Sequence, residues 1–147
     1  MKKNIITDAS CIIAFNNIGR FDVLQATCPF IITTPEVAAE NNDPLPEWIQ
    51  VIAVKDTIKI KSLSSFLGLG EASAIALALE TENPLVILDD KKARRFAQNI
   101  GLDIIGIVGL LRIGYKQGLI PDIDYIIENL QKTGFRLPEN TEDLIKR

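Results

Sequence analysis

Residues 85–105 read LVILDDKKARRFAQNIGLDII, an apolar run followed by two aspartates, a polar segment and a second apolar run. The unbroken apolar run Leu85–Leu88 is typical of a buried strand. Lys91–Ile100 favours a helix that ends at Gly101, since glycine readily adopts the left-handed conformation after a last helical turn. Ile104-Ile105 is a further strand candidate. A strand, a helix and a strand in this order predict a parallel sheet covered by helices.

The same alternation of short apolar runs and longer helical segments extends over the rest of the chain. Further strand candidates are Ile5-Ile6, Phe30–Ile32 and Val51–Val54. Helices are expected near Ser10, after Pro35, over 71–82, over 108–117 and from Pro121, where Ile123, Ile126, Ile127 and Leu130 share one side. Residues 56–67 fit either a helix or a loop. Because there is no repeat, low-complexity stretch or linker, we expect a single domain over residues 1–147.

The chain contains no histidine, and this excludes several kinds of active site. A Ser-His-Asp triad, a Cys-His pair and an HExxH zinc site all require that residue. Hydrolytic chemistry would therefore depend on carboxylates, lysine, hydroxyl groups or a bound metal ion. The formal net charge of −3 lacks the basic balance typical of nucleic-acid-binding domains, although cations bound to clustered acids would offset it.

Hydropathy and cysteine usage predict a cytoplasmic protein without membrane contact. No apolar run approaches the roughly 18 residues of a membrane span, and Asp8 interrupts the start of the chain where a secretory signal would be apolar. Cys11 and Cys28 lack CxxC spacing. In a reducing compartment they are expected to be small core hydrophobes.

Acidic residues directly follow two of the expected strands. Asp8 comes after Ile5-Ile6, and Asp89-Asp90 come after Leu85–Leu88. Ligands of a parallel sheet bind beyond the carboxyl ends of its strands, so these acids meet at one edge if the two strands are neighbours. Crowded carboxylates then need cations or protons between them. A structural alternative is that Asp8 caps the helix near Ser10 and that Asp89 or Asp90 caps the next helix.

Two glutamates extend the set of candidate acids. Glu40 lies four residues after Glu36 and shares its helix face, which points either into the cleft or into solvent. Glu71 is in the first turn of its helix, where the helix dipole alone favours a negative charge. Only the combination of these glutamates with the aspartates is informative. It is an oxygen-only donor set of the kind that Mg²⁺ and Mn²⁺ prefer.

Five segments together resemble a PIN domain, specifically the branch of uncharacterised proteins related to VapC-type toxins, over nearly the whole chain. They are TDASCIIAF (7–15), PEVAAE (35–40), LGEASAIALALE (69–80), VILDDKKARRFAQNIGLDIIGIVGLL (86–111) and KQGLI (116–120). The Gly-Glu-Ala element and the DD-KKAR stretch are the most specific. The resemblance implies an α/β fold of three layers, α/β/α, with a central, mostly parallel sheet of four to five strands.

The resemblance also implies a metal-dependent ribonuclease that hydrolyses single-stranded RNA with Mg²⁺ or Mn²⁺. The matching catalytic acids are Asp8, Glu40, Glu71 and Asp90. The matching metal ligands are Asp8, Glu71, Asp90 and, at the middle place of its tripeptide, Asp89; Ser10 matches a hydroxyl that orients the first acid. The candidate RNA-binding residues Lys91, Lys92, Arg94 and Arg95 are equally explained as solvated charges on a helix.

Two departures from the family pattern and two competing functions accompany this interpretation. Leu88 and Ile107 stand where many such proteins have a hydroxyl residue.

One competing function is phosphoryl transfer to Asp8, which the Ser at position 10 argues against. The other is a PIN-fold binding partner without useful activity. An antitoxin protein and a homodimer formed through the isoleucine-rich helix 120–130 are the expected protein partners.

Overall fold

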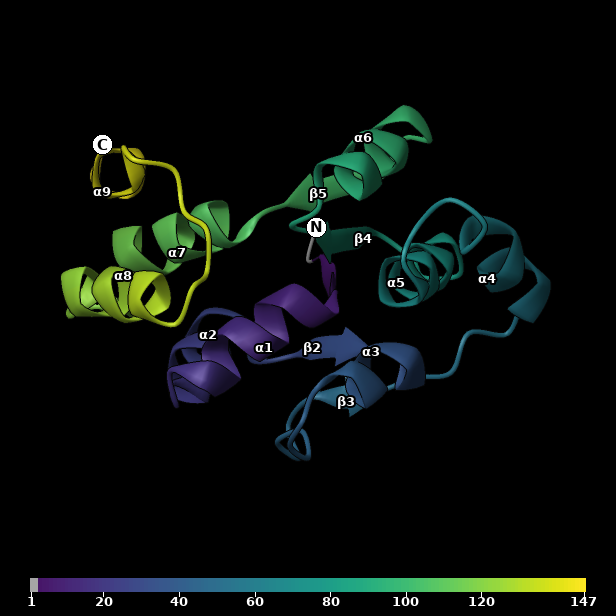
Figure 1. The fold of residues 1–147 in the computed structure, drawn as a ribbon, viewed down its shortest axis with the longest axis horizontal. Helices are drawn as coiled ribbons and strands as arrows, with labels where there is room; N and C mark the ends of the chain where they lie inside the picture. Colours follow the sequence, from purple (N-terminus) through teal and green to yellow (C-terminus); the bar gives the residue numbers. More distant parts are fainter. Residues whose placement is uncertain (1–2) are drawn as a thin grey trace.

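The computed structural model describes residues 3–147 and contains a central sheet of five parallel strands (Figure 1). The strands are β1 Asn4–Thr7, β2 Ile31–Thr33, β3 Gln50–Val51, β4 Pro84–Ile87 and β5 Asp103–Ile105. They lie in the order β3-β2-β1-β4-β5. The chain therefore builds the sheet outward from β1 to β3 and then returns to the other side of β1, which makes the boundary between β1 and β4 the point where strand order reverses. The expected α/β fold is confirmed.

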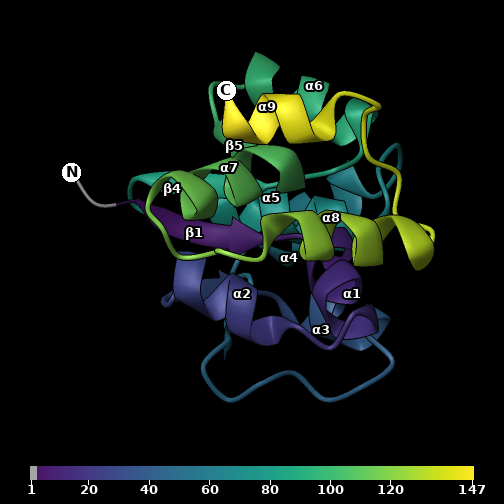
Figure 2. The same cartoon turned by 90° about the vertical axis from the view of Figure 1, so that its left-hand side faces the viewer.

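Helices cover both faces of this sheet. They are α1 Ala9–Asn17, α2 Phe21–Thr27, α3 Pro35–Glu40, α4 Thr57–Leu63, α5 Leu69–Leu79, α6 Lys91–Asn99, α7 Ile107–Lys116, α8 Ile123–Lys132 and α9 Thr141–Lys146. Ile6 and Val86 face a core shared with α4, α5 and α6, whereas their strand neighbour Ile87 faces a core shared with α1, α2, α7 and α8. This alternation of side chains along the strands produces the three-layer α/β/α arrangement, whose layers lie side by side in Figure 1. Figure 2 looks onto the layer that contains α1, α2, α7 and α8, with the sheet behind it.

Several element boundaries differ from those expected. The strand expected over Val51–Val54 is only the two-residue β3, and the helix expected over 71–82 begins at Leu69 and ends at Leu79. After this helix Asn83 adopts a positive φ of 51°, and the Glu80 carboxylate accepts hydrogen bonds from the backbone N–H groups of Lys55 and Asp56. Residues 57–63 are helical, which settles the choice between helix and loop for that segment.

The apolar side of α8 is buried within the chain. Ile123, Ile126, Ile127 and Leu130 are all at most 3% exposed in the core that α1, α2 and α7 also line. The expectation that this helix exceeds what one core can cover is therefore wrong, because these side chains are already covered. Cys11 and Cys28 lie in the same core as free thiols, as expected.

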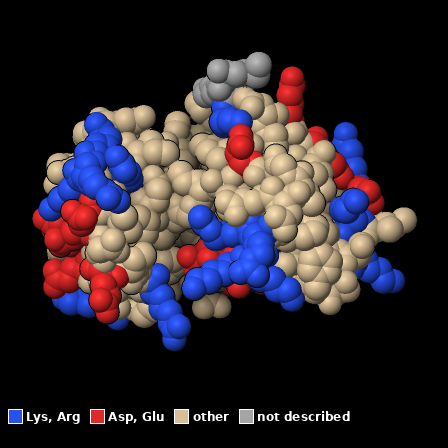
Figure 3. Space-filling model, turned by 90° about the horizontal axis from the view of Figure 1, so that it is seen from above, with Lys and Arg blue, Asp and Glu red and all other residues tan. Residues whose placement is uncertain are grey.

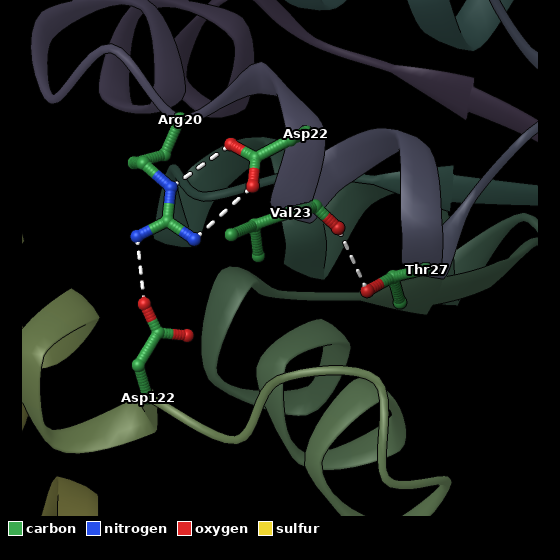
Figure 4. A network of polar contacts seen from close by, with 5 residues as sticks. All are labelled: Arg20, Asp22, Val23, Thr27 and Asp122. Carbon is green, nitrogen blue, oxygen red and sulfur yellow. Dashed lines mark hydrogen bonds and ion pairs between the residues drawn. The ribbon is translucent and has the colours of Figure 1, made fainter.

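An arginine fastens the start of α8 to the N-terminal helices (Figure 4). Arg20 donates to both carboxylate oxygens of Asp22, at 2.9 and 3.1 Å, and to Asp122 Oδ2 at 2.8 Å. These partly exposed contacts contribute little free energy, so the position of α8 depends mainly on its buried apolar side. Over the described residues 3–147, no helix is long and apolar enough to cross a membrane.

Candidate active site

Asp8 lies at the carboxyl end of β1 and accepts two backbone hydrogen bonds. Its Oδ1 accepts from the Cys11 N–H at 3.2 Å, which caps α1, and its Oδ2 accepts from the Asp89 N–H at 3.0 Å. The residue is 2% exposed. The expected structural role as an N-cap is therefore real, and the same carboxylate also ties the end of β1 to the end of β4.

The surroundings of Asp8 disfavour its ionised form. Burial raises its pKa to about 7, the hydrogen bonds from Cys11 and Asp89 oppose this rise, and the nearby carboxylates of Asp89 and Glu71 add to it. A carboxylate in this position is stabilised by a proton or by a cation. Asp8 and Asp89 thus meet at one edge, as expected from their positions after the strands, whereas Asp90 is not among the charges that raise the pKa of Asp8.

The two aspartates after β4 have different local roles. Asp90 caps α6, with its Oδ2 accepting from the Ala93 N–H at 2.9 Å. Partial burial raises the pKa of Asp89, whereas the Arg94 guanidinium lowers it and Asp90 raises it. Arg94 is itself held in place because its Nη1 donates to the Leu88 carbonyl at 2.9 Å. Asp89 consequently has a cation beside it, and Asp90 retains Oδ1 outside its cap.

Glu40 and Glu71 face a shared hollow of about 390 Å³. Its other lining residues are Ala9, Ser10 and Ile13 of α1. Partial burial raises the pKa of Glu40, and the Glu71 carboxylate raises it further. The structure thus brings an acid from α3 and an acid from α5 together beside the start of α1.

Two glycines leave room for these glutamates. A Cβ atom on Gly70 would lie 2.2 Å from Glu40 Oε2, and a Cβ atom on Gly68 would lie 2.5 Å from Glu71 Oε2. Both distances are far below van der Waals contact. The Gly-Leu-Gly-Glu sequence that begins α5 therefore makes the space in which both carboxylates lie.

A chain of buried hydroxyl groups fixes α3 against α5. Ser73 Oγ donates to the Gly70 carbonyl at 2.8 Å, so the 2.6 Å contact between Thr34 Oγ1 and Ser73 Oγ uses the Thr34 proton. Thr34 Oγ1 also accepts from the Val37 N–H and so caps α3. Because Thr34 and Ser73 are fully buried, these bonds fix the backbones of α3 and α5, which carry Glu40 and Glu71, relative to each other.

The structure shows which of Ser10 and the four basic residues of α6 lie beside the acidic residues. Ser10 lines the glutamate hollow, and within the described chain its hydroxyl makes no hydrogen bond to Asp8. Lys91 and Arg94 line a second hollow of about 600 Å³ beside Asp89, which Lys92 and Arg95 do not. Figure 3 shows Lys and Arg side chains gathered beside acidic ones on the face where α6 lies.

Arg136 was not among the residues singled out from the sequence. It lies in the connection between α8 and α9 and lines two hollows that also contain Asp89. A single basic residue in a connection between helices carries no periodic or motif signal, so only the fold reveals its place.

The donor chemistry of the site fits a hard divalent cation. All candidate ligands are carboxylates, Asp8 is crowded by two others, and two glycines hold open the space around the glutamates. Among residues 3–147, no three acidic side chains converge closely enough to enclose one ion. Mg²⁺ does not require such a cage, because it usually binds through one or two carboxylates plus waters and substrate phosphates.

Comparison with known proteins agrees with this geometry. A family model described as a PIN domain matches residues 4–147, which is nearly the whole chain. No curated protein matches the sequence. PIN domains are generally nucleases and typically use divalent metal ions. With five parallel strands and acids gathered at the switch between β1 and β4, the chain belongs to the PIN-domain family.

Proposed function

We propose that this protein is a ribonuclease that hydrolyses phosphodiester bonds of single-stranded RNA with Mg²⁺ or Mn²⁺. The observation that carries the proposal is Asp8, a buried carboxylate that two backbone N–H groups hold in place beside other acids. A residue needed only as a helix cap has no reason to be crowded by like charges. Membership of a nuclease family supplies the reaction class.

The acidic residues take distinct roles in this proposal. Asp8, Glu71, Asp90 and Asp89 would supply the ligands of the cation, one or two of them directly and the others through bound waters, because no three acids of residues 3–147 converge on one point. The ion, when bound, lowers the pKa of water and offsets charge on the phosphoryl oxygens. Glu40 accepts the proton of the attacking water, because its raised pKa makes it a better base than an exposed glutamate. Ser10 lines the same hollow and orients that water.

The basic residues of α6 supply the contacts to RNA phosphates in this proposal. Lys91 and Arg94 line a hollow next to Asp89, and Lys92 and Arg95 are exposed on the same helix. Such charges compensate for an acidic site and a net charge of −3. Arg94 has a second role, since its bond to the Leu88 carbonyl holds the strand end that carries Asp89.

The resemblance to VapC-related proteins supports a finer proposal about biological context. We place the protein in the cytoplasm as a toxin whose partner is an antitoxin protein. A homodimer, if formed, would use a surface other than the apolar side of α8, which is buried within the chain. Two buried free thiols are compatible with a reducing compartment. Slower growth on expression, relieved by Asp8→Asn, would support the toxin role, and unimpaired growth with an active nuclease would contradict it.

A PIN-fold binding partner without activity is the competing function. The absence, over residues 3–147, of three acids converging on one point favours it. Phosphoryl transfer to Asp8 has less support, because both oxygens of that buried carboxylate already accept backbone hydrogen bonds and are poorly placed to attack a phosphate.

Cleavage of single-stranded RNA separates these functions. We expect the purified chain to cut a labelled single-stranded RNA with Mg²⁺ or Mn²⁺ and to stop when EDTA is added. Asp90→Asn should abolish cleavage, since asparagine still caps α6 but is a poor ligand. Asp89→Asn should reduce it less, because Asp89 is already close to Arg94.

The matched control is Asp103→Asn, which removes a carboxylate on edge strand β5 that pairs with Lys3 at 2.6 Å. This variant should cleave like the wild type. Cleavage that persists in EDTA would remove the metal from the mechanism. Wild-type activity in Asp90→Asn would remove Asp90 from the site, and the absence of any cleavage would favour the binding partner.

A further inference from the structure

Three hollows at the carboxyl ends of the strands lie next to one another, because neighbouring hollows share lining residues, and we refer to them together as the groove. Ser10 and Ile13 line both the glutamate hollow and a second one of about 430 Å³. Asp89 and Arg136 line both that second hollow and the third, of about 600 Å³. The groove therefore runs from the two glutamates past Asp89 to the start of α7.

The connection between α8 and α9 forms one wall of this groove. It leaves α8 through Gly134, whose φ of +90° suits glycine, and the Phe135 N–H donates to the Leu130 carbonyl at 3.0 Å. At its other end the Pro138 carbonyl accepts from the Thr141 N–H at 3.1 Å. Phe135 and Leu137 pack on the core. The segment is thus anchored on both sides of Arg136.

Arg136 lies in this anchored segment and lines the groove. It is exposed, and within the described part of the chain it makes no hydrogen bond or ion pair. Arg20 and Arg94 differ from it, since Arg20 binds two aspartates and Arg94 donates to the Leu88 carbonyl. Arg95 also lacks a side-chain partner among the described residues, but it lines none of the three hollows. An arginine without a partner, held beside an acidic site, suits a ligand that carries negative charge. Its planar donor fork matches a phosphate in particular.

We infer that Arg136 binds a backbone phosphate of single-stranded RNA and holds the strand in the groove as it passes Asp89 toward Asp8. This inference rests on the proposed ribonuclease function and names a binding residue for it. Because phosphates are common to all sequences, Arg136 should contribute affinity without base preference. It is a binding residue and takes no part in proton transfer.

The test measures binding separately from cleavage. The anisotropy of a short fluorescein-labelled RNA is followed with Ca²⁺ in place of Mg²⁺, and a gel verifies that the RNA stays intact. Arg136→Ala should bind the RNA about fivefold more weakly at roughly 0.1 M salt, because one phosphate contact is lost. The slope of log affinity against log salt concentration should become shallower by about 0.7. Arg136→Lys should keep the slope and lose less affinity. The control Arg112→Ala removes an equal charge from α7, outside all three hollows, and should bind like the wild type.

The outcomes distinguish this inference from the proposed function. Equal weakening in Arg136→Ala and Arg112→Ala would reveal only a general charge effect and overturn the inference, as would wild-type affinity in Arg136→Ala. A wild-type chain that does not bind RNA would also overturn it. Specific loss of binding in Arg136→Ala, in a chain that never cleaves RNA, would support the inference and refute the nuclease function. Unchanged melting temperatures verify that the variants are folded.

Discussion

The Asp8 carboxylate combines a structural contact with an unfavourable electrostatic position. Its two oxygens accept backbone hydrogen bonds from Cys11 and Asp89, which fix it in one orientation. Its burial and the neighbouring acids nevertheless raise its pKa to about 7. The same residue therefore stabilises the local backbone and, when ionised without a cation, destabilises the fold. This conflict is typical of residues kept for function rather than for stability.

The raised pKa of Asp8 predicts how stability depends on pH without metal. The native state keeps a proton on Asp8 up to about pH 7, whereas the unfolded state releases it near 3.8. The stabilisation is therefore complete below pH 3.8 and is lost as the pH rises through 7. The loss is on the order of 4 kcal/mol.

Urea unfolding in EDTA over this pH range measures the effect. Asp8→Asn should show a much smaller decline, since asparagine does not titrate and can still cap α1. Its amide nitrogen cannot accept the second backbone hydrogen bond, from Asp89, so its stability should be lower by a similar amount at every pH. Glu40 and Asp89, whose pKa values are also raised, would account for the remainder. Parallel stability curves for the two proteins would mean that Asp8 is ionised at no cost in the native state.

At the scale of elements, the contact between α3 and α5 sets the distance between the two glutamates. The Thr34–Ser73 hydroxyl pair fixes the helices, and Gly70 lets the Glu40 carboxylate lie against the first turn of α5. A methyl group at position 70 would meet the far end of the Glu40 side chain, which can rotate away. The helices need not separate, so the fold should tolerate the change while the site does not.

Gly70→Ala should accordingly reduce activity without reducing stability. The added methyl group displaces the Glu40 carboxylate, and a misplacement of this size lowers kcat/KM on the order of 10- to 100-fold. The free energy of unfolding should be unchanged or rise by up to about 1 kcal/mol, because alanine is the better helix former. Steady-state cleavage and urea unfolding give the two quantities.

A double-mutant cycle with Glu40→Gln tests the cause. If Gly70→Ala acts by moving Glu40, it should have little further effect in a chain that already carries Glu40→Gln. Additive losses would mean that the glycine matters for another reason. A large drop in stability would mean that the methyl group forces α3 away from α5.

The elements that could be predicted from sequence are those with a strong local signal. The runs Ile5-Ile6 and Leu85–Leu88 are buried on both faces of the sheet, so they are apolar without interruption and place Asp8 and Asp89-Asp90 at strand ends. The helices α2 and α9 are six or seven residues long and have few buried positions, so no periodic pattern marks them.

Some contacts of the candidate site could not be predicted from the sequence, because they join segments that are far apart in the chain. The Asp8 bond to the Asp89 N–H and the place of Arg136 beside Asp89 both depend on segments far apart in the chain. For Ser10, by contrast, the motif was recognised in the sequence, but the expected contact with Asp8 is absent from the part of the chain that the structure describes. Ser10 follows the family pattern, yet the Cys11 N–H is the group that bonds to Asp8.

At the scale of the whole molecule, the strand order makes one site out of segments from four parts of the chain. The order places β1 beside β4, so Asp8 meets Asp89 at the switch point, and α3 and α5 bring Glu40 and Glu71 to the start of α1. Because each of these segments also packs on the core, a cation bound among the acids would stabilise the complete fold. The unfolded chain, in which the acids are far apart, would not bind it.

Mn²⁺ should therefore raise the melting temperature of the wild-type chain. A hundredfold excess over Kd stabilises the native state by about 2.7 kcal/mol, which corresponds to a rise of roughly 5 to 10 °C for a chain of this size. Asp8→Asn should lose most of this rise, whereas Asp103→Asn, which changes the far edge of the sheet, should keep it. If Asp8 served only as a helix cap, asparagine would replace it and the rise would be unaltered. Thermal melts of the three proteins with and without Mn²⁺ separate the two roles, and an undiminished shift in Asp8→Asn would remove Asp8 from the metal site.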